Sequence, residues 1–300
     1  MKFETSLKSG TFVTFPGGAL TGQGRIEFAA PYAEDCWFII ADQTPVHPLS
    51  SRWPDQPGDL GQITFADGAL FNFTNAWTGL VDTEAGVLLI GEEVNLARKG
   101  EGDWQSVVVH IVQSAQNMHA YVGQEARFTV DPHRRKALSV AHTAAHLAAL
   151  ALNAASAPFW TKAFSDVDAF GRPNLDKAAI QMSSIQQDLS TDIYRLGKSL
   201  KKKGFDRDRF HEHIESLGAE INSIIRSWLK SEALISVTPP EGLLDDVRLW
   251  RSNLNGTEVT IPCGGTHVGS LSDISQIEVN LAPTEDGFVM TTRGQNRRLM

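Results

Sequence analysis

The chain has 300 residues, of which 42% are hydrophobic and 21% charged, the composition of an ordinary globular protein. This composition argues against a disordered chain or a collagen-like repeat, and two cysteines, Cys36 and Cys263, are too few for a disulfide scaffold. At roughly 150 residues per domain, the length predicts about two domains. The N-terminal residues lack the pattern of a secretory signal and no run of about 18 uninterrupted apolar residues occurs, so we expect a reducing, cytoplasmic location.

The net charge of −8 is unevenly distributed along the chain. Residues 1–130 carry 7 basic and 15 acidic side chains, whereas residues 131–300 carry 20 of each. Binding of phosphates depends on clustered lysine and arginine side chains. Any contact with a polyanion is therefore expected in the second part of the chain.

Residues 1–130 have the pattern of short strands joined by turns. Apolar or alternating runs are separated by glycine, proline, asparagine and aspartate, which is typical of a small antiparallel β-barrel or sandwich. The segment His47–Asp59 is a long proline-rich loop, and long loops on such folds often carry function. The expected strands are Thr11–Phe15, Arg25–Phe28, Cys36–Ala41, Gln62–Phe65, Val87–Ile90 and Ser106–Val112.

The pattern changes at Asp131-Pro132, which predicts domains of 1–130 and 131–300. An alanine- and leucine-rich helix is expected from about Arg135 to Ala155, with Asp131 as its N-cap. Apolar residues three and four apart predict a second helix over Arg209–Lys230, and Leu175–Leu200 fits a helix or a strand about equally. Because strands follow these helices, the second part is predicted to be α+β. The expected strands are Leu234–Val237, Val247–Trp250, Glu258–Ile261, Gln276–Asn280 and Phe288–Thr292.

Two pairs of residues have the spacing of metal ligands. His142 and His146 are four apart and share one helical face, although an isolated pair of this kind also occurs for packing reasons. Cys263 and His267 flank a Gly-Gly bend, which lets a thiolate and an imidazole approach one another. The two pairs together supply three imidazoles and one thiolate, the ligand types that Zn²⁺ favours. We therefore predict a zinc site at these four residues.

The HxxxH pattern of the two helical histidines, followed by CGGTH at 263–267, resembles the editing domain of alanyl-tRNA synthetase and its free-standing relatives, the AlaX family. DQTPVHP (42–48) and DQPGDLG (55–61) are similar to the N-terminal barrel of the longer AlaX proteins, and VRLW (247–250) precedes CGGTH as it does in that family. The resemblance implies a small antiparallel barrel followed by an editing domain with a zinc-binding helix and an antiparallel sheet. It also implies hydrolysis of the ester that links serine or glycine to the 3′ end of alanine tRNA, a step in translation quality control.

Three departures from that family concern positions that face the substrate. This chain has SSRWPD (50–55) before Gln56-Pro57, where the family has a Gly-Gly-Gly-Gln stretch. Thr161-Lys162 replaces a Gln-Lys pair of the synthetase, and Ala145 replaces a threonine within HxxxH. Two alternatives therefore stay open, a zinc hydrolase acting on a small ester or amide without tRNA, and a zinc-stabilised RNA-binding module without turnover.

Catalysis at a zinc ion with four protein ligands requires an open position. Either one ligand stands aside, His267 being the first candidate, or a fifth position opens; alternatively, zinc orients the substrate amine while the terminal ribose hydroxyl and backbone donors assist the water. Thr266 is a candidate catalytic residue that presents its hydroxyl or its backbone N–H to the substrate, with a simple turn hydrogen bond as the alternative. Asp273, the nearest carboxylate in sequence, is a second catalytic candidate, with a surface or capping role as the alternative.

For the tRNA partner, the segment Arg195–Arg209 carries 7 basic and 2 acidic residues. Lys201, Lys202 and Lys203 within it are expected to contact phosphates, unless the run is only a solvated loop. Arg134, Arg135 and Lys136, at the start of the helix that carries the histidines, form a second candidate contact.

Overall fold

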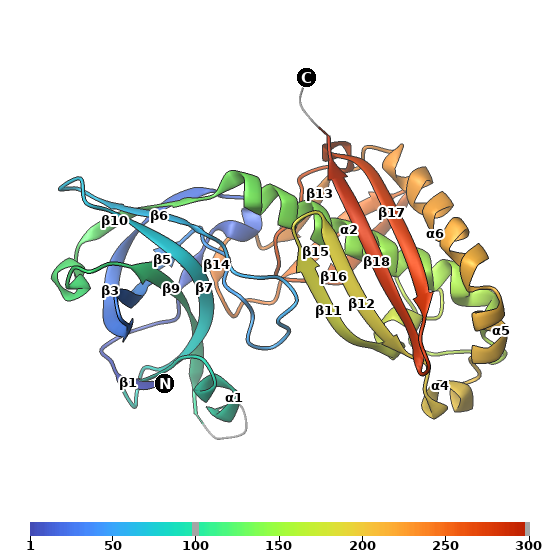
Figure 1. Cartoon of the computed structure of the whole chain (residues 1–300), viewed down its shortest axis with the longest axis horizontal. Helices are drawn as coiled ribbons and strands as arrows, with labels where there is room; N and C mark the ends of the chain where they lie inside the picture. Colours follow the sequence, from blue (N-terminus) through green and yellow to red (C-terminus); the bar gives the residue numbers. More distant parts are fainter. Residues whose placement is uncertain (98–101, 298–300) are drawn as a thin grey trace. The chain divides into compact units, whose positions relative to one another are not determined.

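The chain folds into two units, each of which includes segments that are far apart in the sequence. The structure, a computed structural model, describes residues 1–97 and 102–297. Unit 1 comprises Met1–Arg135, Val237–Leu249 and Cys263–Thr266, and unit 2 comprises Lys136–Ser236, Trp250–Pro262 and His267–Met300. Mainly antiparallel sheets and several helices make the fold α+β, as predicted (Figure 1).

Unit 1 consists mainly of β-strands. Its strands are β1 (Lys2–Glu4), β2 (Phe12–Val13), β3 (Thr21–Ala33), β4 (Cys36–Ala41), β5 (Gln43–Thr44), β6 (Gly61–Phe65), β7 (Leu70–Asp82), β8 (Val87–Leu89), β9 (Trp104–Gln113), β10 (Glu125–Val130) and β14 (Gly242–Leu243), and its helical segments are η1 (Phe15–Gly17), α1 (Glu93–Ala97) and η2 (Met118–Tyr121). Six strands pair in the order β7-β6-β10-β3-β4-β9, and β9 pairs again with β7. The pairing therefore closes on itself as a ring of six antiparallel strands.

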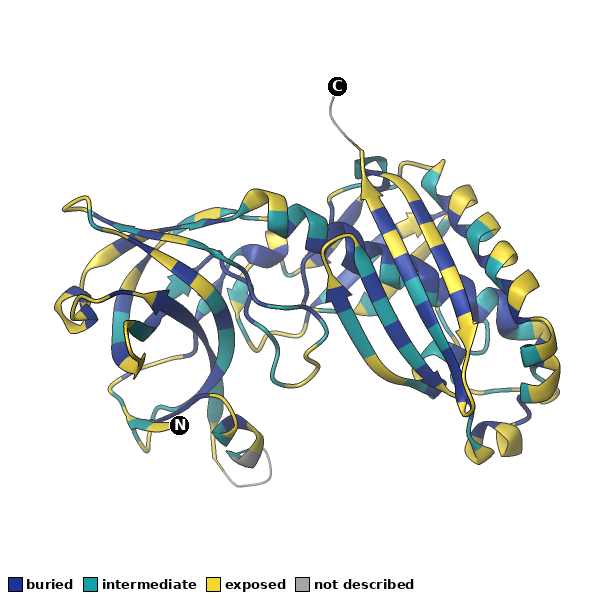
Figure 2. Cartoon of the chain, in the orientation of Figure 1, coloured by how far each residue is buried: buried dark blue, intermediate teal, exposed yellow. Residues whose placement is uncertain are grey.

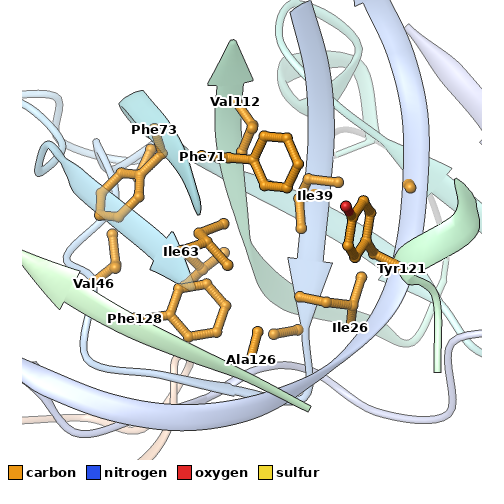
Figure 3. Close-up of a cluster of buried hydrophobic side chains, with 14 of the residues drawn as sticks. Ile26, Ile39, Val46, Ile63, Phe71, Phe73, Val112, Tyr121, Ala126 and Phe128 are labelled. Carbon is orange, nitrogen blue, oxygen red and sulfur yellow. The ribbon is translucent and has the colours of Figure 1, made fainter. Parts of the chain in front are cut away.

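The interior of this ring is filled by side chains from alternate strand positions (Figure 3). In β10, Ala126, Phe128 and Val130 are buried, whereas Glu125 and Arg127 are exposed. Alternation with a period of two places one face of each strand in the interior. Full burial of a large apolar side chain such as Phe128 contributes about 1.5 to 3 kcal/mol.

Unit 2 contains most of the helical residues, an antiparallel four-stranded sheet and most of a three-stranded sheet. Its elements are α2 (Pro132–Ser156), which begins with its first turn in unit 1, η3 (Ala157–Phe159), α3 (Leu175–Ala179), β11 (Ile180–Gln186), β12 (Leu189–Arg195), α4 (Lys198–Lys203), α5 (Arg207–Glu212), α6 (Ile214–Leu229), β13 (Ile235–Thr238), β15 (Leu249–Leu254), β16 (Thr257–Pro262), η4 (Leu271–Asp273), β17 (Ile274–Pro283) and β18 (Gly287–Asn296). The last two residues of β13 and the first residue of β15 belong to unit 1. The sheets have the strand orders β11-β12-β18-β17 and β13-β15-β16.

Helix α6 packs along β17, where buried and exposed residues alternate (Figure 2). Ile277 and Val279 of β17 are buried, and the apolar stripe of α6 supplies the partner surface. Asn222 of α6 fixes the register, because its Nδ2 donates to the Val279 carbonyl oxygen at 2.7 Å and its Oδ1 accepts from the Val279 amide at 2.9 Å.

Helix α2 begins at Pro132, three residues before the expected start at about Arg135. Asp131 is its N-cap as predicted, because Asp131 Oδ1 accepts hydrogen bonds from the backbone amides of His133 and Arg134 at 2.9 and 3.1 Å. By length and composition, Pro132–Phe159 is apolar enough to cross a membrane, but 72% of its apolar window is buried within the protein. Such burial is the pattern of a core helix in a soluble globular protein.

The structure differs in detail from two of the predictions of secondary structure. The single helix predicted over Arg209–Lys230 is wrong, since α5 ends at Glu212 and α6 begins at Ile214, with His213 between them. The backbone amide of His213 bonds to the Phe210 carbonyl, and its ring Nδ1 donates to the Arg209 carbonyl at 2.8 Å, so the ring replaces the helical amide there. The ambiguous segment from Leu175 forms α3 and then the hairpin β11–β12.

Candidate metal centre

The four residues predicted to bind zinc lie together. One nitrogen or sulfur atom from each of His142, His146, Cys263 and His267 lies within 4.8 Å of the corresponding atoms of the other three. The ring centroids of His142 and His267 are 4.4 Å apart, and that of His146 is 5.0 Å from each. Three imidazoles and one thiol at this spacing could hold a metal ion, and the donor set is compatible with zinc.

Local structure explains how the histidines reach this position. His142 and His146 are one turn apart on α2, and Ala144 between them adds little bulk. Strand β18 approaches α2 closely at Gly294, where a Cβ atom would lie 2.8 Å from Val140 Cγ1. Small residues on both elements therefore let the sheet pack against the helix that carries the ligands.

The pKa shifts of His146 and Cys263 are compatible with the binding of a divalent cation at this site. His146 Nε2 is buried, and within the described residues it has no hydrogen-bond partner. Burial and the neighbouring His142 hold the pKa of His146 well below its ordinary value, so the imidazole is neutral and able to bind a metal at pH 7. Burial raises the pKa of the Cys263 thiol to about 12, so this thiol needs an adjacent cation to ionise at neutral pH.

Thr143 contacts His267, one of the four candidate metal ligands. Its hydroxyl lies 3.3 Å from His267 Nδ1 and accepts a hydrogen bond from the Val268 amide at 3.3 Å. Such partners fix the ring orientation of metal-binding histidines. Trp250 is fully buried, with its ring centroid 5.5 Å from that of His146.

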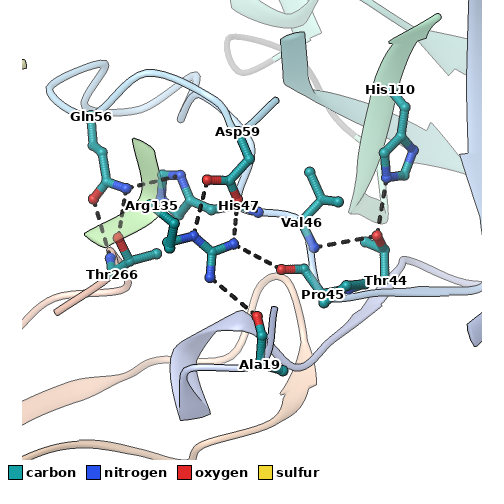
Figure 4. Close-up of polar contacts among 10 residues, drawn as sticks. All are labelled: Ala19, Thr44, Pro45, Val46, His47, Gln56, Asp59, His110, Arg135 and Thr266. Carbon is teal, nitrogen blue, oxygen red and sulfur yellow. Dashed lines mark hydrogen bonds and ion pairs between the residues drawn. The ribbon is translucent and has the colours of Figure 1, made fainter. Parts of the chain in front are cut away.

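Thr266, a predicted catalytic residue, is held by Gln56, which the sequence does not identify as a site residue. Gln56 Nε2 donates to Thr266 Oγ1 at 2.8 Å, and the Thr266 amide donates to Gln56 Oε1 at 3.2 Å (Figure 4). Gln56 Nε2 also lies 3.4 Å from Nδ1 of His47. The loop His47–Asp59 and its DQPGDLG motif mark the surroundings of Gln56 as a candidate functional region. Neither indicates that Gln56 contacts Thr266.

Arg135 occupies a different environment from the one that the sequence predicts. Its side chain is 5% exposed, and its guanidinium donates to Asp59 and to the carbonyl oxygens of Ala19 and Pro45 (Figure 4). A phosphate contact from Arg135 does not fit this burial. The neighbouring Arg134 is half-buried.

The other predicted residues lie outside the metal cluster. Asp273 forms an ion pair with Lys136 at 3.1 Å, with both side chains more than a third exposed. Lys201, Lys202 and Lys203 are exposed on α4. Asp273 therefore has a surface interaction of the kind considered as its alternative role.

Comparison with known proteins adds no family to this description. No protein-family model matches the chain, and no curated protein matches it. The functional argument therefore rests on the residues of the cluster and on the motifs that carry them.

Proposed function

We propose that the protein is a zinc-dependent hydrolase of the aminoacyl ester of mischarged alanine tRNA, acting on Ser-tRNA or Gly-tRNA in the cytoplasm. The observation that carries the proposal is the metal cluster, because HxxxH and CGGTH, the two motifs behind the resemblance, supply all its residues. The closed ring of strands in unit 1 supports the further likeness to the N-terminal barrel of the longer AlaX proteins.

Hydrolysis of an aminoacyl ester requires attack of water on the carbonyl carbon and stabilisation of the negative charge on the carbonyl oxygen. Zn²⁺, when bound, supplies Lewis acidity that polarises a carbonyl and makes water more acidic. The imidazoles of His142, His146 and His267 and the Cys263 sulfur would hold the ion. Thr266 would donate a hydrogen bond to the substrate, and no general base is assigned.

The surface proposed for tRNA phosphates is the basic region around α4. Lys201, Lys202 and Lys203 lie on this helix, and Lys162 and Arg207 line an adjoining hollow of about 650 Å³ together with Lys201. Asp206 and Asp208 also line it, but Asp206 is engaged as the N-cap of α5. Arg134 is a further proposed phosphate contact. Arg135 is not, because its side chain is buried in unit 1 in an ion pair with Asp59.

The test is a deacylation assay on the zinc-loaded full-length chain, with Ser-tRNA and Gly-tRNA as substrates and Ala-tRNA as the correctly charged control. We expect release of serine or glycine, and H146A should lower turnover by about 100-fold or more and reduce bound zinc. The matched control is H133A, which removes an exposed histidine from the same helix.

Three other results would contradict the proposal. Undiminished turnover in the H142A/H146A double variant would exclude a role for zinc. Mischarged tRNA that is bound but stays intact would indicate the RNA-binding module, which the four protein ligands favour because structural zinc sites have that number. Hydrolysis of a small ester, without binding or deacylation of mischarged tRNA, would indicate the non-tRNA hydrolase.

A further inference from the structure

Two segments of unit 2 that are 43 residues apart in sequence lie side by side after the end of α2. The amide and the hydroxyl of Thr161 donate to the Gly204 carbonyl oxygen at 2.8 and 2.9 Å. The Asp206 amide donates to the Phe159 carbonyl oxygen at 2.8 Å. Gly204 caps α4 with a φ of 101°, and a Cβ atom there would lie 2.8 Å from Cβ of Lys162. Glycine at this position therefore lets the segment that follows α2 pack against the end of α4.

A stacked pair of aromatic rings lies in the first of these segments. The ring centroids of Trp160 and Phe164 are 4.4 Å apart, and the angle between the ring planes is 23°. Trp160 packs edge to face against the buried Phe205, with the centroids 5.1 Å apart. The indole covers one face of the half-buried Phe164 ring, so a further flat group can stack only on the other face. Phe164 therefore forms a platform that is supported from the interior of unit 2.

Three lysines from different elements surround this platform. Lys162 belongs to the same segment, Lys177 to α3 and Lys203 to α4, and together with Phe164 they line a hollow of about 700 Å³. The ammonium nitrogen of Lys203 lies 5.3 Å from the centroid of the Phe164 ring. Asp166 also lines the hollow, where it forms an ion pair with Lys177 at 2.9 Å. The hollow thus combines an aromatic ring with a positive net charge.

The hollow at Phe164 is continuous with the basic surface described above, because Lys162 also lines the hollow that contains Lys201 and Arg207. Lysines that follow a strand of phosphates, together with a ring on which a base can stack, are the features of a surface that binds single-stranded nucleic acid. A double helix hides the faces of its bases, and an acidic peptide needs only the lysines. The combination therefore favours a single strand of RNA.

The metal centre and this hollow lie at different points along α2. His146 and Ser156, the last residue of α2, are ten residues apart, which corresponds to about 15 Å of helix. A stacked strand advances about 3.4 Å per nucleotide, so a strand whose 3′ end lies at the metal centre would reach the end of α2 within about five nucleotides. One short strand could therefore occupy both places.

We propose that Phe164 is a stacking platform for one unpaired base of an RNA strand, and that Lys162 and Lys203 bind the adjacent phosphates. The assignment of this strand to the 3′ end of mischarged tRNA rests on the proposed hydrolase function. Stacking on Phe164 rests on the hollow alone.

The test measures binding of a fluorescently labelled, single-stranded RNA octamer to the full-length chain at several salt concentrations. F164A and F164L remove the flat ring, so they should weaken binding by about 10- to 100-fold with little change in the salt slope. F164Y keeps the ring and should bind as the wild type does. K162A/K203A should lower the logarithmic salt slope by about 1.4, because each phosphate contact to a single strand contributes about 0.7.

The matched control is Y32A, because Tyr32 is an exposed ring of unit 1 that stacks on Phe38 with a centroid distance of 4.6 Å. Y32A should bind the octamer with wild-type affinity. Duplex RNA of the same sequence should bind F164L as tightly as it binds the wild type. In the wild-type chain, an octamer that carries 4-thiouridine should crosslink to residues 160–166 under ultraviolet light, a result that does not depend on the folding of any variant.

Wild-type affinity of F164L for the octamer would overturn the proposal, as would an equal loss in Y32A, an equal loss for duplex RNA, or crosslinks that map only elsewhere. An unchanged salt slope in K162A/K203A would overturn the phosphate contacts. Binding of the octamer through Phe164 by a chain that deacylates no tRNA would contradict the proposed function and support the platform. Wild-type tRNA affinity and deacylation in F164L, with octamer binding lost, would overturn only the assignment to the 3′ end of tRNA.

Discussion

Replacement of Arg135 by methionine should destabilise unit 1 rather than weaken the binding of tRNA. The guanidinium Nε donates to Asp59 Oδ1 at 2.9 Å, and two further bonds reach the carbonyl oxygens of Pro45 and Ala19 at 2.9 and 3.2 Å. Asp59 is fully buried. The variant R135M leaves this carboxylate without its cation, and loss of one partner of a buried pair costs about 3 to 5 kcal/mol.

That cost is a large fraction of the 5 to 15 kcal/mol by which domains are typically stable. Urea unfolding followed by tryptophan fluorescence measures it, and at about 2 kcal/mol per molar urea the midpoint should fall by roughly 2 M. R134M, at the neighbouring half-buried arginine, should change the free energy of unfolding by much less. The double variant D59N/R135M should recover part of the loss, because no buried charge is left unpaired.

A change of less than about 1 kcal/mol in R135M would refute this reasoning. So would a stable R135M variant that binds tRNA with a reduced dependence on salt, since that result would return Arg135 to the tRNA surface.

The remaining predictions concern acid stability and the basic helix. Burial lowers the pKa of His47 and of His110 from 6.5 to about 4, so between these pH values the unfolded chain binds protons that the folded chain excludes. The free energy of unfolding should therefore fall as the pH drops from 6.5 toward 4, by up to about 3 kcal/mol per histidine; urea titrations at several pH values check this, and H110N should show a smaller decrease. For α4, K201A/K202A/K203A should weaken tRNA binding and lower its logarithmic salt slope by about 2 to 3. An unchanged slope would remove α4 from the interface, and K8A, an exposed lysine of unit 1, is the control.

The metal cluster could be predicted because each of its two pairs of residues lies within a short stretch of sequence. His142 and His146 are brought together by one helical turn, and Cys263 and His267 by one short bend. Three imidazoles and one thiol then indicate a metal site, because these are ligand types that Zn²⁺ favours. The N-cap at Asp131 was predictable for the same reason, because its partners are the next few residues.

The environment of Arg135 could not be predicted because its partner is distant. Charged side chains are rarely buried unless they are paired, so an arginine in the first turn of a helix indicates a surface position. Its partner, Asp59, precedes it by 76 residues in a loop without regular spacing. The contact of Gln56 with Thr266 has the same origin, over 210 residues.

Strand β7 was missed for a different reason. Phe71 and Phe73 are buried, while Asn72 and Thr74 between them are exposed, which is the alternation of a strand. Asparagine and glycine also favour turns, and both occur in this 13-residue strand. Pairing with β6 and β9 outweighs those local preferences, because each residue gains hydrogen bonds and packing from two neighbours.

The assignment of late segments to unit 1 has a consequence for the order of events during synthesis. Strand β14 pairs with β2 through Gly242 and Val13, which are about 230 residues apart. At roughly 5 to 20 residues per second, a ribosome needs about 10 to 50 s to make that stretch. Throughout this interval β2 lacks its antiparallel neighbour and Gln56 lacks Thr266. Unit 1 therefore reaches its final structure only after most of unit 2 has been translated, although its sequence begins first.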